Sequence, residues 1–167
     1  IGVAISIAAI WKRIAALKAQ GYGIDASTRK GYRLGEIPDR MLASEIRDGL
    51  KTRVIGQQDI HYYEQTDSTN RRAKELAAGG TAEGTLVVAE AQTRGRGRLE
   101  RHWFSPAGQS IYVSLILRPA LPPGEATRLV LLTAVAAAET LIHTVGLKAT
   151  IKWPNDILAR GRKIAGI

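Results

Sequence analysis

A segment rich in arginine and glycine, residues 92–103, holds the densest group of side chains that could do chemistry. Four arginines fall within eight positions, with glycines between the first three: Arg94, Gly95, Arg96, Gly97, Arg98 and Arg101. A guanidinium group is a planar fork of donors that fits phosphate and carboxylate oxygens, and glycine lets the backbone approach a ligand closely. Trp103 adds a surface for stacking or packing. The segment predicts an anion-binding loop; the alternative is a flexible basic loop that contacts RNA or nothing.

A second group, Asp67-Ser68-Thr69-Asn70, places hydroxyl and amide groups at the expected start of a helix. The backbone N–H groups of a helix's first turn have no partner within the helix, so they also point outward. Together these groups could hold a polar head group such as a urea or a carboxylate. A plain helix cap is the alternative interpretation.

A third group lies near the end of the chain, in Lys152-Trp153-Pro154-Asn155-Asp156 and at Lys163. Asn and Asp next to Pro are typical of a tight turn at the end of a strand. Lys163, in an otherwise apolar strand, is either an edge residue or a point charge aimed into a site. Asp156 could be a general base, a metal ligand or a turn residue. Three histidines are far apart and show no metal-ligand spacing: His61, His102 and His143.

The elements that must position these groups form an irregular mixture of helices and strands. We expect helices over residues 41–50, 71–78 and 124–145, and strands over 61–65, 85–91, 110–117 and 149–153, followed by a hairpin over 157–167. Because strands and helices do not alternate regularly, the pattern favours an α+β fold over a doubly wound sheet.

Residues 6–34 predict a helix followed by a hairpin. Ser6 is a suitable N-cap, an apolar stripe follows at helical spacing, and Gly21 ends the helix. A basic helix followed by a basic-tipped hairpin is typical of the recognition helix and wing of a winged helix-turn-helix. The alternative is a small solvated helix and hairpin. The candidate DNA-binding residues are Ser6, Lys12, Arg13, Arg29 and Lys30.

Composition limits the classes of function. The 167 residues carry a net charge of +9, which suggests an anionic partner. The absence of cysteine excludes disulfides, cysteine-ligated zinc, iron–sulfur clusters and thiol nucleophiles. The most apolar stretch, residues 129–147, contains Glu139 and His143, so we expect a buried helix rather than a membrane span. Because the chain starts at Ile1 and ends in an apparent strand, we also expect a fragment.

In order and spacing, these segments resemble the biotin protein ligases, specifically the bifunctional type that also acts as the biotin operon repressor. The matching segments are Asp67-Ser-Thr-Asn70, Gln92 with Gly95-Arg-Gly-Arg98 and Trp103, Lys152-Trp-Pro-Asn-Asp156, and Lys163-Ile-Ala-Gly-Ile167. The resemblance implies a truncated α+β chain. Residues 1–36 would be the C-terminal part of a winged helix-turn-helix. Residues 37–167 would be the N-terminal portion of a mixed-sheet, class II synthetase-like catalytic domain.

The resemblance implies a two-step, ATP-dependent reaction. Biotin and ATP give biotinyl-5′-AMP, and a lysine of the biotin carboxyl carrier protein of acetyl-CoA carboxylase then takes the biotin. Such chemistry needs positioning, neutralisation of anionic oxygens and exclusion of water more than side-chain acids. The resemblance also implies Mg²⁺, operator DNA as a partner, a homodimer, and a cytoplasmic location without a membrane.

The resemblance assigns catalytic roles to Arg98 and Lys163. The implied biotin-binding residues are Ser68, Thr69, Asn70, Gln92, Arg96, Gly97, Arg98 and Lys163. The implied adenylate and ATP residues are Gly95, Arg96, Arg98, Arg101, Trp103, Asn155, Asp156 and Lys163, with Asp156 as a neighbour of Mg²⁺.

Two residues depart from the family pattern. Glu100 stands where the family usually has glycine, and Ile7 stands where the recognition helix often carries arginine, which weakens the DNA interpretation. Two alternatives stay open beside the ligase: a DNA-binding regulator only, and a lipoate or octanoyl ligase of related fold.

Overall fold

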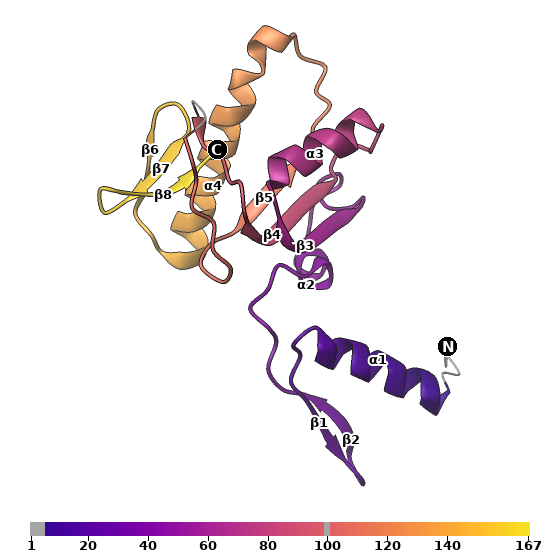
Figure 1. Cartoon of the computed structure of the whole chain (residues 1–167). Coiled ribbons are helices and arrows are strands. Elements are labelled where there is room, and N and C mark those ends of the chain that lie inside the picture. The colour runs from indigo at the N-terminus through magenta and orange to yellow at the C-terminus, as the bar shows by residue number, and fades with distance from the viewer. Residues whose placement is uncertain (1–5, 99–100) are drawn as a thin grey trace.

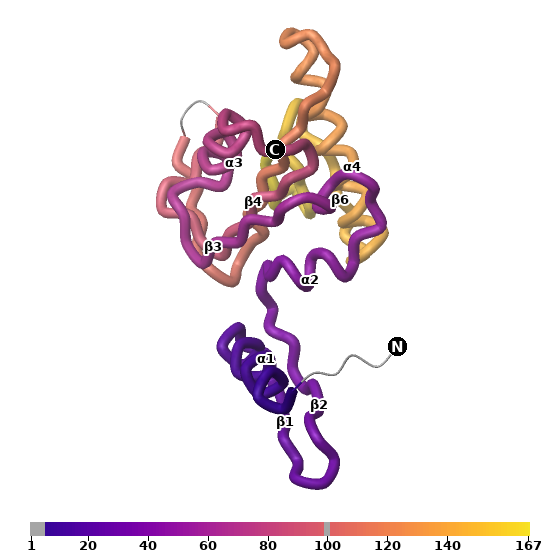
Figure 2. The backbone as a smooth tube through the Cα atoms, turned by 90° about the vertical axis from the view of Figure 1, so that its right-hand side faces the viewer, coloured from indigo at the N-terminus to yellow at the C-terminus, as the bar shows by residue number. Residues whose placement is uncertain are grey.

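The computed structural model describes residues 6–98 and 101–167, so Glu100 lies outside the described residues. A connecting segment, residues 35–42, joins an N-terminal unit to a larger body of mixed helices and strands (Figure 1). The N-terminal unit projects from one end of the larger body in both perpendicular views (Figure 2).

The N-terminal unit is the predicted helix and hairpin. It contains α1 (Ile7–Ala19) and the antiparallel strands β1 (Ile24–Ser27) and β2 (Gly31–Leu34). The Ser6 hydroxyl accepts a hydrogen bond from the Ala9 N–H at 3.3 Å, so Ser6 is the N-cap. Helix α1, which is described over its whole length, contains no buried residue, so its apolar stripe is only partly covered.

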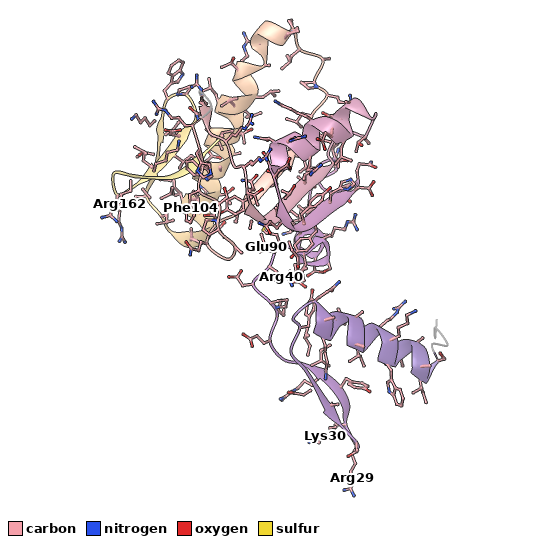
Figure 3. The ribbon with its side chains drawn as sticks, viewed as in Figure 1. Arg29, Lys30, Arg40, Glu90, Phe104 and Arg162 are labelled. Carbon is pink, nitrogen blue, oxygen red and sulfur yellow. The ribbon has the colours of Figure 1, made fainter. Side chains whose placement is uncertain are left out.

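The connecting segment is fastened to the larger body at Arg40. The Arg40 Nη2 group donates to the Tyr62 hydroxyl at 2.5 Å and to the Glu64 carboxylate at 2.5 Å. The next backbone N–H, of Met41, donates to Glu90 Oε1 at 2.8 Å. Arg40 and Glu90 lie close together where the segment meets the body (Figure 3). Burial and the nearby Glu90 carboxylate raise the pKa of Tyr62.

Helix α2 (Ala43–Asp48) provides a second connection. The Tyr22 hydroxyl, at the end of the first helix–hairpin turn, donates to the Glu45 carboxylate and lies 3.3 Å from Ser44 Oγ. The hydrogen bond to Glu45 raises the pKa of Tyr22. Helix α2 also packs against β3 (Ile60–Thr66) of the larger body, so it contacts both parts of the chain.

The first sheet has the order β3-β4-β5. Its strands are β3 (Ile60–Thr66), β4 (Leu86–Gln92) and β5 (Tyr112–Leu115), with β3 parallel and β5 antiparallel to β4. Helix α3 (Thr69–Ala78) covers one face. Ala73 of α3 packs with Val87 and Ile116 in the core. The apolar residues of β4 are buried because β4 is the central strand of the sheet. The two ends of β4 are therefore held in fixed positions.

The second sheet, of order β6-β7-β8, is antiparallel. It contains β6 (Ala149–Lys152), β7 (Asp156–Ala159) and β8 (Arg162–Gly166). A 3₁₀ turn, η2 (Pro123–Glu125), leads into α4 (Thr127–Val145), which packs mainly on β6 and ends at Gly146 with φ of 66°. Gly146 adopts the left-handed conformation that commonly closes a helix.

Only small residues of α4 are buried, Ala134 and Ala138. The helical stretch Pro123–Val145 is by length and composition able to cross a membrane; an 18-residue window within it has a mean hydropathy of 1.5, and 11% of that window is buried. Within the described residues it is the one stretch of this kind. The absence of a membrane span therefore stays a prediction.

The α+β prediction is confirmed, with shifts at element ends. Helix α3 begins at Thr69 rather than at residue 71, because extended backbone at Ser68 (φ −162°, ψ 132°) makes that residue the N-cap. The strand expected over 110–117 is shorter, because only Tyr112–Leu115 pairs with β4. The helix expected over 41–50 is reduced to Ala43–Asp48.

Candidate functional site

An open cleft of about 1510 Å³ lies where the start of α3, the end of β4, the arginine-rich loop, β5 and the edge of the second sheet meet. Its lining includes all the predicted biotin and adenylate residues except Gly95. The cleft therefore brings together three segments that are far apart in the sequence.

The N-terminal turn of α3 is held by Asp67. Its Oδ1 atom accepts a hydrogen bond from the Ser68 N–H at 2.8 Å, and its carboxylate pairs with Arg71 at 3.1 Å and Arg72 at 3.3 Å. The backbone hydrogen bond and, more weakly, the arginine charges lower the pKa of Asp67. The Ser68 hydroxyl makes no capping hydrogen bond. Asp67 thus fixes the helix start, while Ser68 lies on the cleft.

Gln92, the last residue of β4, joins that turn to the loop. Its Oε1 atom accepts hydrogen bonds from the Thr69 N–H at 2.8 Å and the Thr69 hydroxyl at 3.1 Å. Its Nε2 group donates to Ser105 Oγ at 3.2 Å. On β5, the Ser114 hydroxyl lies 2.9 Å from Thr69 Oγ1 and 2.7 Å from Asn70 Oδ1. A continuous polar network therefore links the predicted Thr69, Asn70 and Gln92.

Sequence reasoning missed Ser105 and Ser114. Ser114 lies two residues after Tyr112, and both are buried while Val113 between them is exposed. A serine on the buried face of an alternating strand was the available signal. Ser105 lies in the loop, where no periodicity applies.

The arginine-rich loop is folded back on itself rather than extended. The Trp103 N–H donates to the Gly95 carbonyl at 2.8 Å, and the Gly97 N–H donates to the Arg101 carbonyl at 2.8 Å. Gly95 allows this close approach, because a Cβ there would lie 2.5 Å from the Trp103 carbonyl oxygen. Gly95 therefore shapes the loop, although it does not itself line the cleft.

Arg98 reaches from the loop to the second sheet. Its Nη1 group donates to Asn155 Oδ1 at 3.2 Å, across 57 positions of sequence. Asn155 is buried, and its side-chain Nδ2 donates to the Ile167 carbonyl at 3.3 Å. Asn155 therefore joins the loop to the end of the chain.

Lys163 is a point charge on the cleft and also lies on an edge strand. Its Nζ atom is 2.7 Å from Asp156 Oδ1 and 5.0 Å from the centre of the Trp103 ring. The ammonium group is thus held between a carboxylate and an aromatic face. Asp156 Oδ1 is engaged in this ion pair, and the described residues contain no group of three or more His, Cys, Asp or Glu that could hold a metal ion.

The predicted DNA-binding residues lie on the other part of the chain. Arg29 and Lys30 lie at the tip of the β1–β2 hairpin, far from the cleft (Figure 3). Lys12 and Arg13 are exposed on α1. The Ser6 hydroxyl is engaged as the helix cap.

Comparison with protein families identifies two regions. Residues 62–167 match the model of the biotin/lipoate A/B protein ligase family, and residues 3–33 match an HTH domain. The chain is 48% identical over 159 residues to a bifunctional ligase/repressor BirA of Bacillus subtilis, covering 95% of this chain and 49% of that protein. Its identity with the Escherichia coli BirA is 35%, covering 98% of this chain and 49% of that protein. The chain spans about half the length of these curated relatives.

Solved structures agree with these matches. A biotin protein ligase from Aquifex aeolicus in complex with biotin and ATP superposes with a TM-score of 0.55 at 33% identity, covering 65% of this chain and 44% of that chain. A Leishmania major biotin protein ligase in complex with biotinyl-5-AMP gives a TM-score of 0.54 at 28% identity, covering 65% and 50%. The fold, the family match and the relatives together confirm the resemblance: this chain belongs to the biotin/lipoate A/B protein ligase family.

Proposed function

We propose that the protein containing this chain is an ATP-dependent biotin ligase, which forms biotinyl-5′-AMP and transfers biotin to a lysine of a carboxylase carrier protein. The observation that carries the proposal is the single cleft that joins the Thr69–Gln92 polar network, the arginine-rich loop and Lys163. The solved Aquifex relative is in complex with biotin and ATP, which supports the same pair of substrates here.

The polar network is assigned to the ring of biotin. Ser68, Thr69, Asn70 and Gln92 supply hydroxyl and amide groups within one turn of helix and one strand end. Hydrogen-bonding groups held by their own neighbours cost little to order when a polar ring binds, so this network favours a ureido head group. Arg96 and Gly97 belong to the loop that would enclose the ligand.

The cationic groups are assigned to the reacting atoms. In the first step, a biotin carboxylate oxygen attacks the α-phosphorus of ATP, and the bond from phosphorus to the pyrophosphate oxygen breaks. Arg98 and Lys163 lie on the same cleft and would offset the negative charge on these oxygens. Arg101, Trp103, Asn155 and Asp156 complete the assigned adenylate side, with Gly95 as the residue that shapes the loop.

In the second step, the amine of the carrier lysine attacks the acyl carbon of the adenylate, and AMP leaves. The loop matters here because the mixed anhydride must be kept from water until the amine arrives. Asn155 accepts from Arg98 and so holds the loop against the second sheet. No step is assigned to Mg²⁺; substrate phosphates would hold it, with Asp156 as the neighbouring carboxylate.

A DNA-binding role is a second proposed function of the same protein. It rests on the basic tip of the hairpin at Arg29 and Lys30 and on the HTH match over residues 3–33. Residues 1–36 would act on operator DNA and residues 37–167 would belong to the ligase. Exposed lysine and arginine at a wing fit phosphate contacts. Binding to DNA upstream of the protein's own gene, strengthened by biotin with ATP and weakened by salt, would support this role.

Adenylate formation tests the ligase proposal. The full-length protein should release pyrophosphate from ATP only when biotin is added, and lipoate should not compete with biotin. Pyrophosphate release driven by lipoate instead of biotin would move the protein to the lipoate branch of its family.

A further inference from the structure

Lys163 and Gly166 lie on the same face of β8 because this strand contains a bulge. The pairing of β7 with β8 shifts after Lys163, so that Ile164 is an extra residue with no partner on β7. In a regular strand, two residues that are three positions apart lie on opposite faces, and one inserted residue reverses this relation. Lys163 and Gly166 therefore face the same side, and both line the cleft.

Gly166 leaves open the space that the end of the Lys163 side chain fills. A Cβ on Gly166 would lie 3.3 Å from Lys163 Cε and 3.3 Å from Lys163 Nζ, which is tighter than an ordinary van der Waals contact. The next nearest atom, Asp156 Oδ1, would be 3.9 Å away, at an ordinary contact distance. The φ angle of Gly166 is not positive, so alanine can adopt the same backbone conformation. An alanine here would therefore act on the lysine and not on the strand.

The ammonium group of Lys163 is held by three neighbours. Its Nζ atom is 2.7 Å from Asp156 Oδ1 and 5.0 Å from the centre of the Trp103 ring, and the bare backbone of Gly166 lies against it. The side chain of Lys163 is 37% exposed. Because a lysine stem is flexible, such a charge has a defined position only where its neighbours hold it.

We propose that Gly166 is a positioning residue, which keeps the ammonium group of Lys163 between Asp156 and Trp103. At this place the charge can offset the negative charge that develops on the reacting oxygens of biotin and ATP. The inference rests on the proposed function of Lys163 in adenylation. It goes further by naming the residue that sets the position of the charge.

Alanine at position 166 tests the inference. The readout is the biotin-dependent exchange of labelled pyrophosphate into ATP by the full-length protein at saturating biotin and ATP. Gly166→Ala should lower the exchange rate at least about 10-fold, because a displacement of about 1 Å in a reacting group can cost about 100-fold in rate. Its Tm should stay close to that of the wild type, because the new Cβ meets only the end of a flexible side chain. Gly124→Ala, whose Cβ would meet no atom within 4 Å, should change neither quantity.

A double variant shows whether Gly166 acts through the lysine. In Lys163→Ala, the atoms that a Cβ at position 166 would crowd are gone. Adding Gly166→Ala to this variant should therefore change the remaining exchange rate by less than about twofold, because the effects of two residues in contact are not additive.

The position of the lysine can also be followed without the reaction. In protein labelled with ¹³C at lysine Cε, the NMR signal that is missing from Lys163→Ala belongs to Lys163. The ring of Trp103 should shift this signal away from those of exposed lysines such as Lys18. Gly166→Ala should move it toward the exposed lysines, and Gly124→Ala should not.

The outcomes separate the inference from the function beneath it. An equal loss of exchange on adding Gly166→Ala to the wild type and to Lys163→Ala would mean that Gly166 acts independently of the lysine, and the inference would be wrong. A Gly166→Ala protein that does not fold would also overturn it, because only a side-chain end should have to move. A wild-type protein without biotin-dependent exchange would overturn the proposed function instead, and the NMR signal would still decide whether Gly166 positions Lys163.

Discussion

Replacing Gly95 with alanine tests how far the folded loop depends on one close contact. A Cβ at this position would lie 2.5 Å from the Trp103 carbonyl oxygen and 2.5 Å from Ser105 Oγ. The first of these atoms is backbone, so it cannot rotate away. The Gly95 carbonyl also accepts the hydrogen bond from the Trp103 N–H at 2.8 Å, so relief of the clash would stretch the base of the loop.

The size of the effect follows from the cost of overpacking. Adding a methyl group to a closely packed place costs about 1–3 kcal/mol, which corresponds to roughly 5- to 150-fold weaker binding if the loop must adopt this shape to hold the ligand. The same displacement would move Ser105 away from Gln92. We therefore expect Gly95→Ala to weaken biotin binding within that range.

Calorimetric titration with biotin measures the loss, and two other glycines supply the comparison. A Cβ at Gly97 would meet its nearest atom, the Arg101 carbonyl oxygen, at 3.6 Å, so Gly97→Ala should cost much less than Gly95→Ala. Gly49 faces open space, and Gly49→Ala should leave biotin affinity unchanged. Equal affinities for wild type and Gly95→Ala would refute the steric reasoning.

Three further predictions concern pH, the joint and the wing. The pKa of Asp67 is lowered in the folded state, so the stability that its carboxylate contributes is present above the unfolded pKa of about 3.9 and is lost as the pH falls through the lower folded pKa. Asp67→Asn should therefore flatten the fall of Tm in this acid range. An acid profile of Tm that is the same in the variant and the wild type would contradict this role of Asp67. Arg40→Ala should destabilise the protein by about 1 kcal/mol or less in urea, because its partners are partly exposed, while a loss above about 3 kcal/mol would contradict this estimate. Arg29→Ala with Lys30→Ala should lower the salt dependence of DNA binding by about two phosphate contacts, and an unchanged slope would exclude the wing from the interface.

Functional groups that are neighbours in the sequence could be predicted from the sequence alone. The turn at Ser68 and Thr69 could be read because polar residues at a helix start have a known geometry. Lys163 was left as either an edge residue or a charge aimed into a site; it lies on an edge strand and on the lining of the cleft, and its role in the site stays a prediction. Asp156 pairs with Lys163 through one carboxylate oxygen, and its assignment as a neighbour of Mg²⁺ stays a prediction.

Contacts between distant segments were not predictable in this way. The Arg98 to Asn155 hydrogen bond spans 57 positions, and nothing local to either residue specifies the other. Ser105 and Ser114 were missed because a single serine carries no motif. Their importance appears only when the loop bridges back to Gln92 and brings Ser105 to it, and when β5 packs beside α3 and brings Ser114 to Thr69.

The central claim is that one cleft binds biotin and ATP and joins them through Arg98 and Lys163. Biotin-dependent exchange of labelled pyrophosphate into ATP by the full-length protein measures the adenylation step alone, without a carrier protein. We expect exchange that requires biotin and falls at least about 100-fold in Arg98→Ala and in Lys163→Ala, which is about 2.7 kcal/mol of lost transition-state stabilisation. Exchange at the wild-type rate in both variants would contradict the assignment of this cleft.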